Sequence, residues 1–116
     1  MVTDSTAKEK RIRKEEIRLL KNYTSIDEKR KSVIVGLIRR AAFMRVSLED
    51  LEADIAEYGF TELFAQGTQE PYLRERPATR VYNTMNGGYQ KIIKQLTDLL
   101  PKDEPKPKAG DAFENF

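Results

Sequence analysis

The sequence predicts a mainly α-helical protein, with a helical N-terminal half, a short irregular β-hairpin and a long C-terminal helix followed by a disordered tail. Three observations predict this class. Apolar residues recur at three- and four-residue steps over 33–44 and 82–99, as on one face of a helix. Residues 60–76 lose that period. Residues 101–116 hold three prolines and almost nothing apolar before Phe113, so they cannot bury enough surface to fold alone.

The length of 116 residues is enough for one domain and too short for two ordinary ones. The predicted parts are a disordered lead-in (1–6), a single helical domain (7–100) and a flexible tail (101–116). Within the domain we expect helices over 7–58, a hairpin-like loop over 59–76 and a long helix over 77–100. Because 34% of the residues are charged and 39% are hydrophobic, a lone monomer would have a thin core, and we expect contacts with partners to supplement it.

Two capping boxes predict the starts of the first two helices. Thr6 and Glu9 form the first box, before a helix that runs to about residue 23. The first two turns of this helix hold one apolar side chain, Ile12, so we expect that end to fray or to order on a partner. Ser25 and Glu28 form the second box, before a helix that runs to about residue 45.

Ser47 is the candidate N-cap of a third helix over 48–58, and Gly59 follows as the expected terminator in the left-handed region. Short links at 24–25 and 46–47 imply that these helices pack as antiparallel or sharply crossed neighbours.

Residues 60–76 are predicted to form the hairpin. Apolar and aromatic residues at 60–64 and 72–74 flank a polar stretch in which Gly67 is the turn former. Pro71 lacks a backbone donor, which confines its strand to an edge of the sheet.

The last helix has clear ends and an unusual middle. Pro77 suits its first position and Pro101 stops it. Gly87 and Gly88 lie in its centre, where each costs about 1 kcal/mol relative to alanine. A seam of apolar residues keeps its phase across this pair, which favours one continuous helix over a break at Asn86-Gly87 into two shorter ones.

The seam has heptad spacing. It consists of Tyr82, Met85, Tyr89, Ile92, Leu96 and Leu99. Packing within one chain is the ordinary role of such a stripe, but the long helix, the charge-rich chain and the two glycines also suit a subunit interface, so we expect oligomerisation here.

The net charge of +2 conceals a division between two halves of the chain. Residues 1–46 hold 13 Lys and Arg against 6 Asp and Glu, net +7, and residues 47–116 hold 8 against 13, net −5. An asymmetry of this size predicts a polyanionic partner for the basic half. It also lets the two halves attract each other, within one chain or between chains.

The residue inventory argues against an enzyme. The chain has no cysteine and no histidine, which removes the thiolate nucleophile, the commonest general base and the usual zinc ligands. It has no glycine-rich phosphate loop and no apolar run of the roughly 20 residues that span a bilayer. We therefore expect no catalytic residue, no metal, no cofactor and no membrane partner.

Ten basic residues before Val46 are the candidate DNA contacts. They are Lys8, Lys10, Arg11, Arg13, Lys14, Arg18, Lys21, Lys29, Arg30 and Lys31. Lysine and arginine contacts to phosphates give an affinity that falls with salt, and they carry little sequence information. The alternative is a solvated helix face in which Glu9, Glu15 and Glu16 form ion pairs with these cations.

The predicted third helix does not suit the role of a recognition helix. It carries five acids and no lysine or arginine, whereas a helix in the major groove lies between phosphates. The acids are Glu49, Asp50, Glu52, Asp54 and Glu57. They are spread around the helix, so a solvated face is expected rather than a magnesium site. If DNA is bound, this helix is turned away from it or packs against a basic neighbour.

Several runs of residues resemble one known family. The runs SLEDLEADI (47–55), RPA (76–78) and IKQLTDLLP (93–101), with Tyr58-Gly59, Tyr82-Asn83 and Tyr89 between them, resemble the small terminase subunits of tailed DNA bacteriophages. The resemblance covers residues 15–101, and the last helix is its most specific part.

This resemblance implies a non-catalytic subunit of a genome-packaging motor, in the cytoplasm of an infected bacterial host. Small subunits of this kind form homo-oligomeric rings, bind double-stranded viral DNA and recruit the large terminase subunit, an ATPase and nuclease. It implies that the helix over 77–100 helps to assemble the ring and that the basic N-terminal region faces the DNA. Phe113 and Phe116 are the expected docking residues for the large subunit. The alternative is a helical protein–protein adaptor or small regulator with no DNA role.

Overall fold

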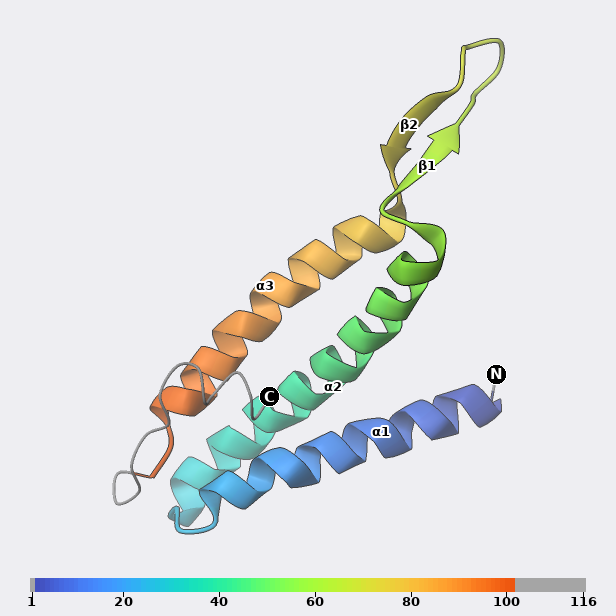
Figure 1. Cartoon of the computed structure of the whole chain (residues 1–116). Coiled ribbons are helices and arrows are strands. Elements are labelled where there is room, and N and C mark those ends of the chain that lie inside the picture. The colour runs from blue at the N-terminus through green and yellow to red at the C-terminus, as the bar shows by residue number, and fades with distance from the viewer. Residues whose placement is uncertain (1, 102–116) are drawn as a thin grey trace.

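The computed structural model describes the backbone of residues 2–101 and the side chains of residues 6–101. The elements in chain order are α1 (Val2–Leu20), a short 3-10 helix η1 (Lys21–Tyr23), α2 (Glu28–Tyr58), β1 (Thr61–Phe64), β2 (Tyr72–Glu75) and α3 (Pro77–Asp98). Figure 1 shows α1 and α3 running back along the longer α2, and the hairpin projecting beyond the end where α2 and α3 meet. The predicted class, mainly helical with a hairpin and a long C-terminal helix, is confirmed.

The start of α1 differs from the prediction. The backbone is helical from Val2, so the predicted disordered lead-in and the predicted N-cap at Thr6 are wrong. Residues 2–6 contain no proline or glycine, so a helix propagates through them at little cost. At the other end, η1 carries Tyr23 into the core, where the phenol donates a hydrogen bond to the main-chain carbonyl of Leu96 in α3.

The predicted second and third helices are one helix. α2 continues through residues 46–47, so the predicted break there is wrong, and Ser47 is a buried residue of the helix interior rather than an N-cap. A serine in a helix interior costs well under about 1 kcal/mol. Packing of α2 against both α1 and α3 outweighs that local preference.

The two ends of α2 are capped. Asp27, not the predicted Ser25, is the N-cap, because its Oδ1 accepts the backbone N–H of Arg30 at 2.9 Å. At the other end Gly59 has φ 86° and donates its N–H to the carbonyl of Ile55 at 2.7 Å. The predicted second capping box is therefore wrong, and the predicted glycine terminator with positive φ is confirmed.

The core lies where the ends of α1 and α3 meet the first half of α2. Its enclosed side chains are Leu19, Tyr23, Ile34, Ile38, Ala41 and Leu96. The apolar face predicted for α2 supplies three of these, although Val33, predicted on the same face, is 63% exposed. The largest fully buried side chains therefore lie at the end of the molecule away from the hairpin, and smaller buried sites continue along α2 at Val46, Leu48 and Ile55.

The hairpin is antiparallel, with Glu62 paired to Arg74 and Phe64 paired to Tyr72. These four side chains lie on one face of the two-stranded sheet. The rings of Phe64 and Tyr72 meet edge to face with centroids 5.8 Å apart. The guanidinium carbon of Arg74 lies 3.6 Å from the centroid of Phe64, and its Nε donates to Glu62 at 2.7 Å. This face is closed by its own contacts.

The other face of the hairpin is open. Leu63 and Leu73 are directly paired across the strands, and both are 69% exposed. Gly67, with φ 62°, lies between the strands, as predicted for the turn former. Pro71 precedes β2, so its missing donor removes no bond from the ladder. The hairpin thus presents an exposed leucine pair beyond the helices.

Arg76 joins the hairpin to the helices. Its guanidinium donates to the carbonyl of Gly59 at 2.6 Å and to Asp54 of α2 at 2.8 Å. The carbonyl of Phe60 accepts the backbone N–H of Arg76 at 3.0 Å and the hydroxyl of Thr79 at 2.8 Å. These bonds fix the base of the hairpin on the junction of α2 and α3.

α3 is continuous, so the alternative of a break at Gly87-Gly88 is wrong. Gly88 faces α2, where a Cβ would lie 3.5 Å from Met44 Cε, an ordinary contact. At Gly87 a Cβ would meet no atom within 4 Å. The glycines therefore affect helix propensity more than packing.

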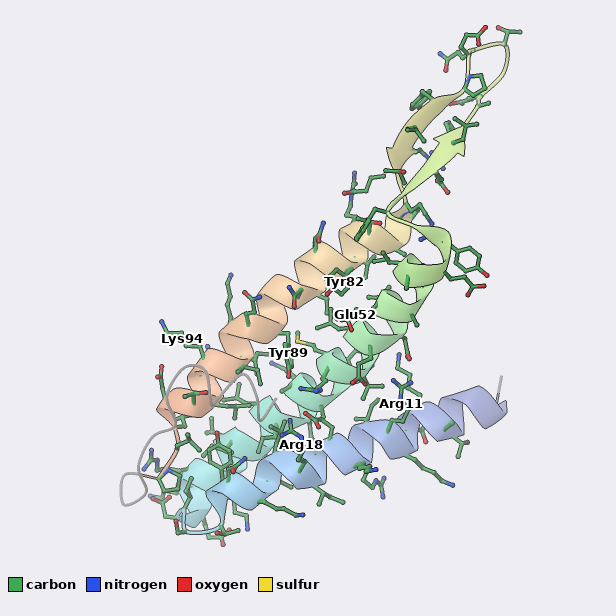
Figure 2. All side chains as sticks on the ribbon, viewed as in Figure 1. Arg11, Arg18, Glu52, Tyr82, Tyr89 and Lys94 are labelled. Carbon is green, nitrogen blue, oxygen red and sulfur yellow. The ribbon has the colours of Figure 1, made fainter. Side chains whose placement is uncertain are left out.

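The heptad seam of α3 packs within the chain. Leu96 is fully buried, and Tyr89, Ile92 and Leu99 pack against the core. The hydroxyl of Tyr82 donates to Glu52 of α2 at 2.9 Å, and Figure 2 shows this pair in the interface of the two helices. The seam thus serves the intramolecular role that the sequence left open as the alternative, and oligomerisation remains a prediction.

Across residues 2–101, no helix is both long enough and apolar enough to cross a membrane. The predicted tail beyond Pro101, with the docking residues Phe113 and Phe116, lies outside the described residues.

Candidate nucleic-acid interface

Four of the predicted DNA contacts form a stripe on the solvent side of α1 and η1. Lys10, Arg13, Lys14 and Lys21 are exposed, and their spacing places them on one side of the helix. Ile17 lies on the same side, between Lys14 and Lys21, and is 52% exposed. At 1.5 Å per residue the four cations extend over about 16 Å. We call these four residues the basic stripe.

The basic stripe is not neutralised by nearby acids. Within the described side chains, none of its four residues has a hydrogen bond or ion pair to a carboxylate. The acids that could have neutralised these cations are Glu9, Glu15 and Glu16. Glu15 makes ion pairs, but its partners Arg18 and Arg45 lie outside the stripe. The stripe therefore presents uncompensated positive charge to solvent.

Two other predicted contacts face α2 instead. Arg11 Nη1 donates to Asp50 at 2.6 Å, Arg11 Nη2 donates to Glu49 at 3.3 Å, and Lys8 Nζ lies 3.6 Å from Asp50. Lys8 also lies 5.4 Å from the ring centroid of Phe43. The hydrogen bond from Arg11 lowers the pKa of Asp50. Arg11 and Lys8 thus hold α1 to α2, and acids of α2 largely neutralise their charge.

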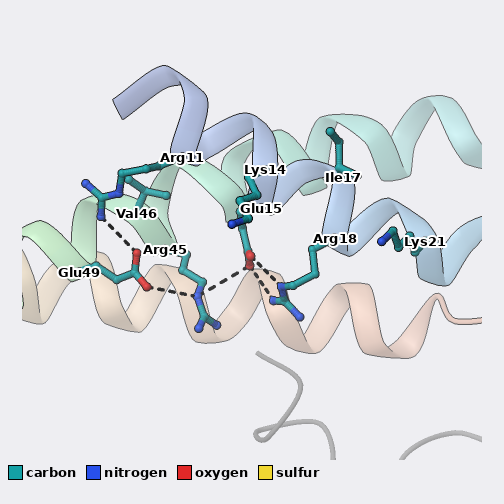
Figure 3. Close-up of a pocket in the computed structure, with 9 residues that line it drawn as sticks. All are labelled: Arg11, Lys14, Glu15, Ile17, Arg18, Lys21, Arg45, Val46 and Glu49. Carbon is teal, nitrogen blue, oxygen red and sulfur yellow. Dashed lines mark hydrogen bonds and ion pairs between the residues drawn. The ribbon is translucent and has the colours of Figure 1, made fainter. Parts of the chain in front are cut away.

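Arg18 belongs to a chain of ion pairs that joins the two helices. Its Nε and Nη2 each donate to Glu15 at 2.7 Å, so the carboxylate is held by both oxygens. Arg45 of α2 lies between Glu15 and Glu49, with its Nε 3.8 Å from each. Figure 3 shows the chain from Arg11 through Glu49, Arg45 and Glu15 to Arg18.

Four of the five acids named in the second half of α2 have structural partners, which the sequence did not identify. Glu49 and Asp50 pair with α1, Glu52 accepts the hydroxyl of Tyr82, and Asp54 accepts Arg76. No group of three or more potential metal ligands occurs among the described residues. The acidic part of α2 therefore packs against a basic neighbour, one of the two arrangements that the sequence allowed.

The start of α2 holds the remaining predicted contacts. Lys29, Arg30 and Lys31 are exposed. Positive charge at a helix N-terminus opposes the helix dipole and costs a few tenths of a kcal/mol per residue. Arg39 and Arg40, further along α2, are also exposed, and the sequence interpretation missed them because they lie within a strongly apolar stretch.

A groove of about 570 Å³ separates α1 from α2 beside the basic stripe (Figure 3). Its lining residues are Arg11, Lys14, Glu15, Ile17, Arg18, Lys21, Arg45, Val46 and Glu49. Five are basic and two are acidic, which leaves a formal charge of +3 around the groove. The sequence did not predict it, because the groove depends on how far apart two helices lie.

Comparisons with protein-family models, with curated proteins and with solved structures found no match. The resemblance to small terminase subunits therefore remains a prediction drawn from the sequence.

Proposed function

We propose that this protein binds double-stranded DNA without catalysis, along the basic stripe of α1 and η1. The proposal rests on the observation that some cations of α1 and η1 are paired with acids and others are not. Arg11 and Lys8 are neutralised by acids of α2, whereas Lys10, Arg13, Lys14 and Lys21 face solvent with no carboxylate partner in the described part of the chain. Unpaired cations in a row are the usual means of binding a phosphate backbone.

The dimensions of the stripe fit a duplex. DNA carries one negative charge per about 1.7 Å of helix axis, so a row of about 16 Å lies within reach of several phosphates. Such contacts read the backbone rather than the bases, so we expect low sequence specificity from this surface alone. Lys29, Arg30 and Lys31 add positive charge near the end of α1.

We further propose that the DNA is viral and that the chain acts as the small subunit of a tailed-phage terminase, in an infected bacterial host. The support is the resemblance over residues 15–101 and the absence of histidine and cysteine from the chain. In this role copies assemble into a ring and recruit the large terminase subunit, with Phe113 and Phe116 as docking residues.

A helical protein–protein adaptor is the second candidate, and one observation favours it. Tyr58, Phe60, Leu63 and Leu73, at and near the hairpin, are 62–69% exposed. Clustered exposed apolar side chains commonly mark a protein interface. An adaptor with no DNA role would bind a protein partner and would not retain duplex DNA at moderate salt.

The first prediction tests the basic stripe directly. Lys10→Ala combined with Arg13→Ala removes two exposed cations three residues apart on α1, so binding to a 20-bp duplex should weaken about 10-fold or more at about 0.1 M salt and the slope of log affinity against log salt should fall by about 2. Fluorescence anisotropy at several salt concentrations measures both quantities.

The matched control is Lys91→Ala combined with Lys94→Ala. These two lysines are also exposed and three residues apart, but they lie on α3, and Figure 2 shows Lys94 pointing away from the other helices. This variant should bind the duplex within about 2-fold of the parent. Equal losses in both variants would mean that the stripe has no special role, and no binding by the parent would reject a DNA role altogether.

A further inference from the structure

We propose that the groove between α1 and α2 is a binding site for a phosphate group. The groove has its own lining, in which α1 and η1 supply cations at steps of three and four residues. These are Arg11, Lys14, Arg18 and Lys21. Arg45 faces them from α2. Five basic side chains around one open groove of about 570 Å³ make a site whose ligand must be anionic.

The two acids of the groove do not neutralise it. Glu15 is held through both oxygens by Arg18, and Glu49 accepts a hydrogen bond from Arg11. Arg11 is also paired with Asp50, which lies outside the groove. Beyond these bonds, Arg45 makes only ion pairs of 3.8 Å with the two acids, and Lys14 and Lys21 have no acidic partner among the described side chains.

Arg45 has donors to spare. Its Nε lies 3.8 Å from both Glu15 and Glu49, too far for a hydrogen bond. A guanidinium carries five N–H donors in a fork that matches two phosphate oxygens. Its side chain is 32% exposed, so a ligand in the groove can reach it.

A buried hydroxyl beside Arg45 also lacks a partner. The hydroxyl of Tyr89 on α3 is buried and makes no hydrogen bond to any described residue. Tyr89, Arg45 and Glu49 line a smaller cavity of about 240 Å³ on the α3 side. Burial raises the pKa of Tyr89, so its hydroxyl stays a neutral donor at physiological pH. The neighbouring Arg45 partly opposes that rise, so the two groups interact beside the groove.

Lys14 and Lys21 complete the site from the solvent side. Both are exposed, line the groove and have no acidic partner among the described side chains. Lys14 of α1 and Lys21 of η1 lie on one wall of the groove and Arg45 of α2 lies on the other, so the groove presents donors to a ligand from two sides. Because Lys14 and Lys21 also belong to the basic stripe, the phosphate has two possible sources, the backbone of a bound duplex or a free phosphate compound. The choice of a duplex as the source rests on the proposed function, whereas the site itself does not.

The experiment uses inorganic pyrophosphate as the probe, titrated into the full chain and followed by calorimetry and by NMR shifts of arginine Nε–Hε signals. We expect saturable binding that weakens about 10-fold or more in Lys14→Gln combined with Arg45→Gln. A second variant, Lys14→Gln combined with Lys21→Gln, changes exposed residues alone, so its expected loss cannot arise from unfolding.

The matched control is Lys10→Gln combined with Arg13→Gln, which removes two stripe cations that do not line the groove. It should weaken pyrophosphate binding less than either groove variant does, because neither side chain lines the groove. Equal losses in the control and in both groove variants, or no pyrophosphate binding by the parent, would overturn the site.

A competition separates the two sources. If pyrophosphate displaces a bound 20-bp duplex and Lys14→Gln with Arg45→Gln weakens duplex binding, a backbone phosphate occupies the groove. If pyrophosphate binds the parent and the duplex does not, the groove stands as a site for a free phosphate compound and the proposed DNA role fails.

Discussion

At the scale of single residues, Tyr23 joins the three helices. It lies in η1, its ring is 3% exposed within the core, and its hydroxyl donates to the carbonyl of Leu96. The spacing of apolar residues places Tyr23 among the apolar residues of the first predicted helix. Its hydrogen-bond partner, however, lies 73 residues away in the chain. A local pattern contains no information about such a partner.

The Tyr23 hydroxyl makes stability depend on pH in the alkaline range. Burial raises its pKa to about 12 from an ordinary value of about 10. Because the folded pKa is the higher one, the contribution of Tyr23 to stability is complete below about pH 10 and is lost as the pH rises toward 12. Urea unfolding at a series of pH values from neutral to alkaline measures this loss.

The control is Tyr23→Phe, which should cost about 1 kcal/mol at neutral pH through the lost hydrogen bond. Above pH 10 this variant should lose less further stability than the parent, since it has no hydroxyl to ionise. The remaining loss reflects Tyr82 and Tyr89, whose pKa values are also raised. Parallel curves for the two proteins would show that Tyr23 is not the titrating group.

The same limit applies to the basic residues of α1. Lys10 and Arg11 are adjacent in the sequence and equivalent in charge, yet Lys10 faces solvent whereas Arg11 pairs with Asp50. Helical spacing shows that adjacent residues point in different directions. Which direction meets the acids depends on how α1 lies on α2, so the sequence predicted the set of cations and not the stripe.

At the scale of elements, helix ends were predictable where a residue enforces them. Gly59 and Pro77 act through backbone conformation, and the structure confirms both positions. Capping boxes are weaker, since each contributes about 1 kcal/mol, and both Thr6 and Ser25 failed as N-caps. At Ser47 the preference for a cap was overridden by packing on two sides.

Two helix glycines give a prediction at this scale. Gly36 and Gly87 lie inside α2 and α3, and a Cβ at either position would meet no atom within 4 Å. Gly36→Ala and Gly87→Ala should therefore each raise the free energy of unfolding by about 1 kcal/mol, because alanine loses less backbone entropy in a helix. Denaturant unfolding followed by circular dichroism measures the change.

Gly59→Ala is the opposing control. The φ of Gly59 is +86°, where a Cβ is strained, so the same substitution should destabilise by about 1–2 kcal/mol. A loss of stability in Gly36→Ala or Gly87→Ala would indicate that the helix there approaches another backbone, as in an assembly of copies.

At the scale of the whole molecule, the charge asymmetry of the sequence is satisfied partly within one chain. Acids near the middle of α2 pair with cations of α1, so the two halves attract each other as the composition allowed. Among the described residues, two of the surfaces that remain open lie at different places. They are the basic stripe on α1 and the leucine pair of the projecting hairpin.

The hairpin gives a prediction about assembly. Since α2 covers much of the heptad seam, copies of the chain must bury another surface, and the exposed Leu63–Leu73 pair is the candidate. Native mass spectrometry of the parent should show a multiple of 13.4 kDa, and Leu63→Lys combined with Leu73→Lys should reduce it toward a single chain. Both side chains are exposed, so the fold should be unaffected.

Lys10→Ala combined with Arg13→Ala serves as the control here, because it lies on α1 and should keep the parent mass. A parent that is a single chain would reject the homo-oligomer. A hairpin variant with the parent mass would place the interface between copies elsewhere.

The amino-acid sequence alone determined the helical class, the hairpin with its turn at Gly67, the continuous last helix and the division of charge. These follow from patterns within a few residues, which periodicity and backbone preference control. The tertiary structure alone decided that α2 is unbroken, that the seam of α3 faces α2, and that a basic groove lies beside the stripe. Those features arise from contacts between residues far apart in the chain. The free energy of these contacts exceeds the local preferences, and no short segment predicts which contacts form.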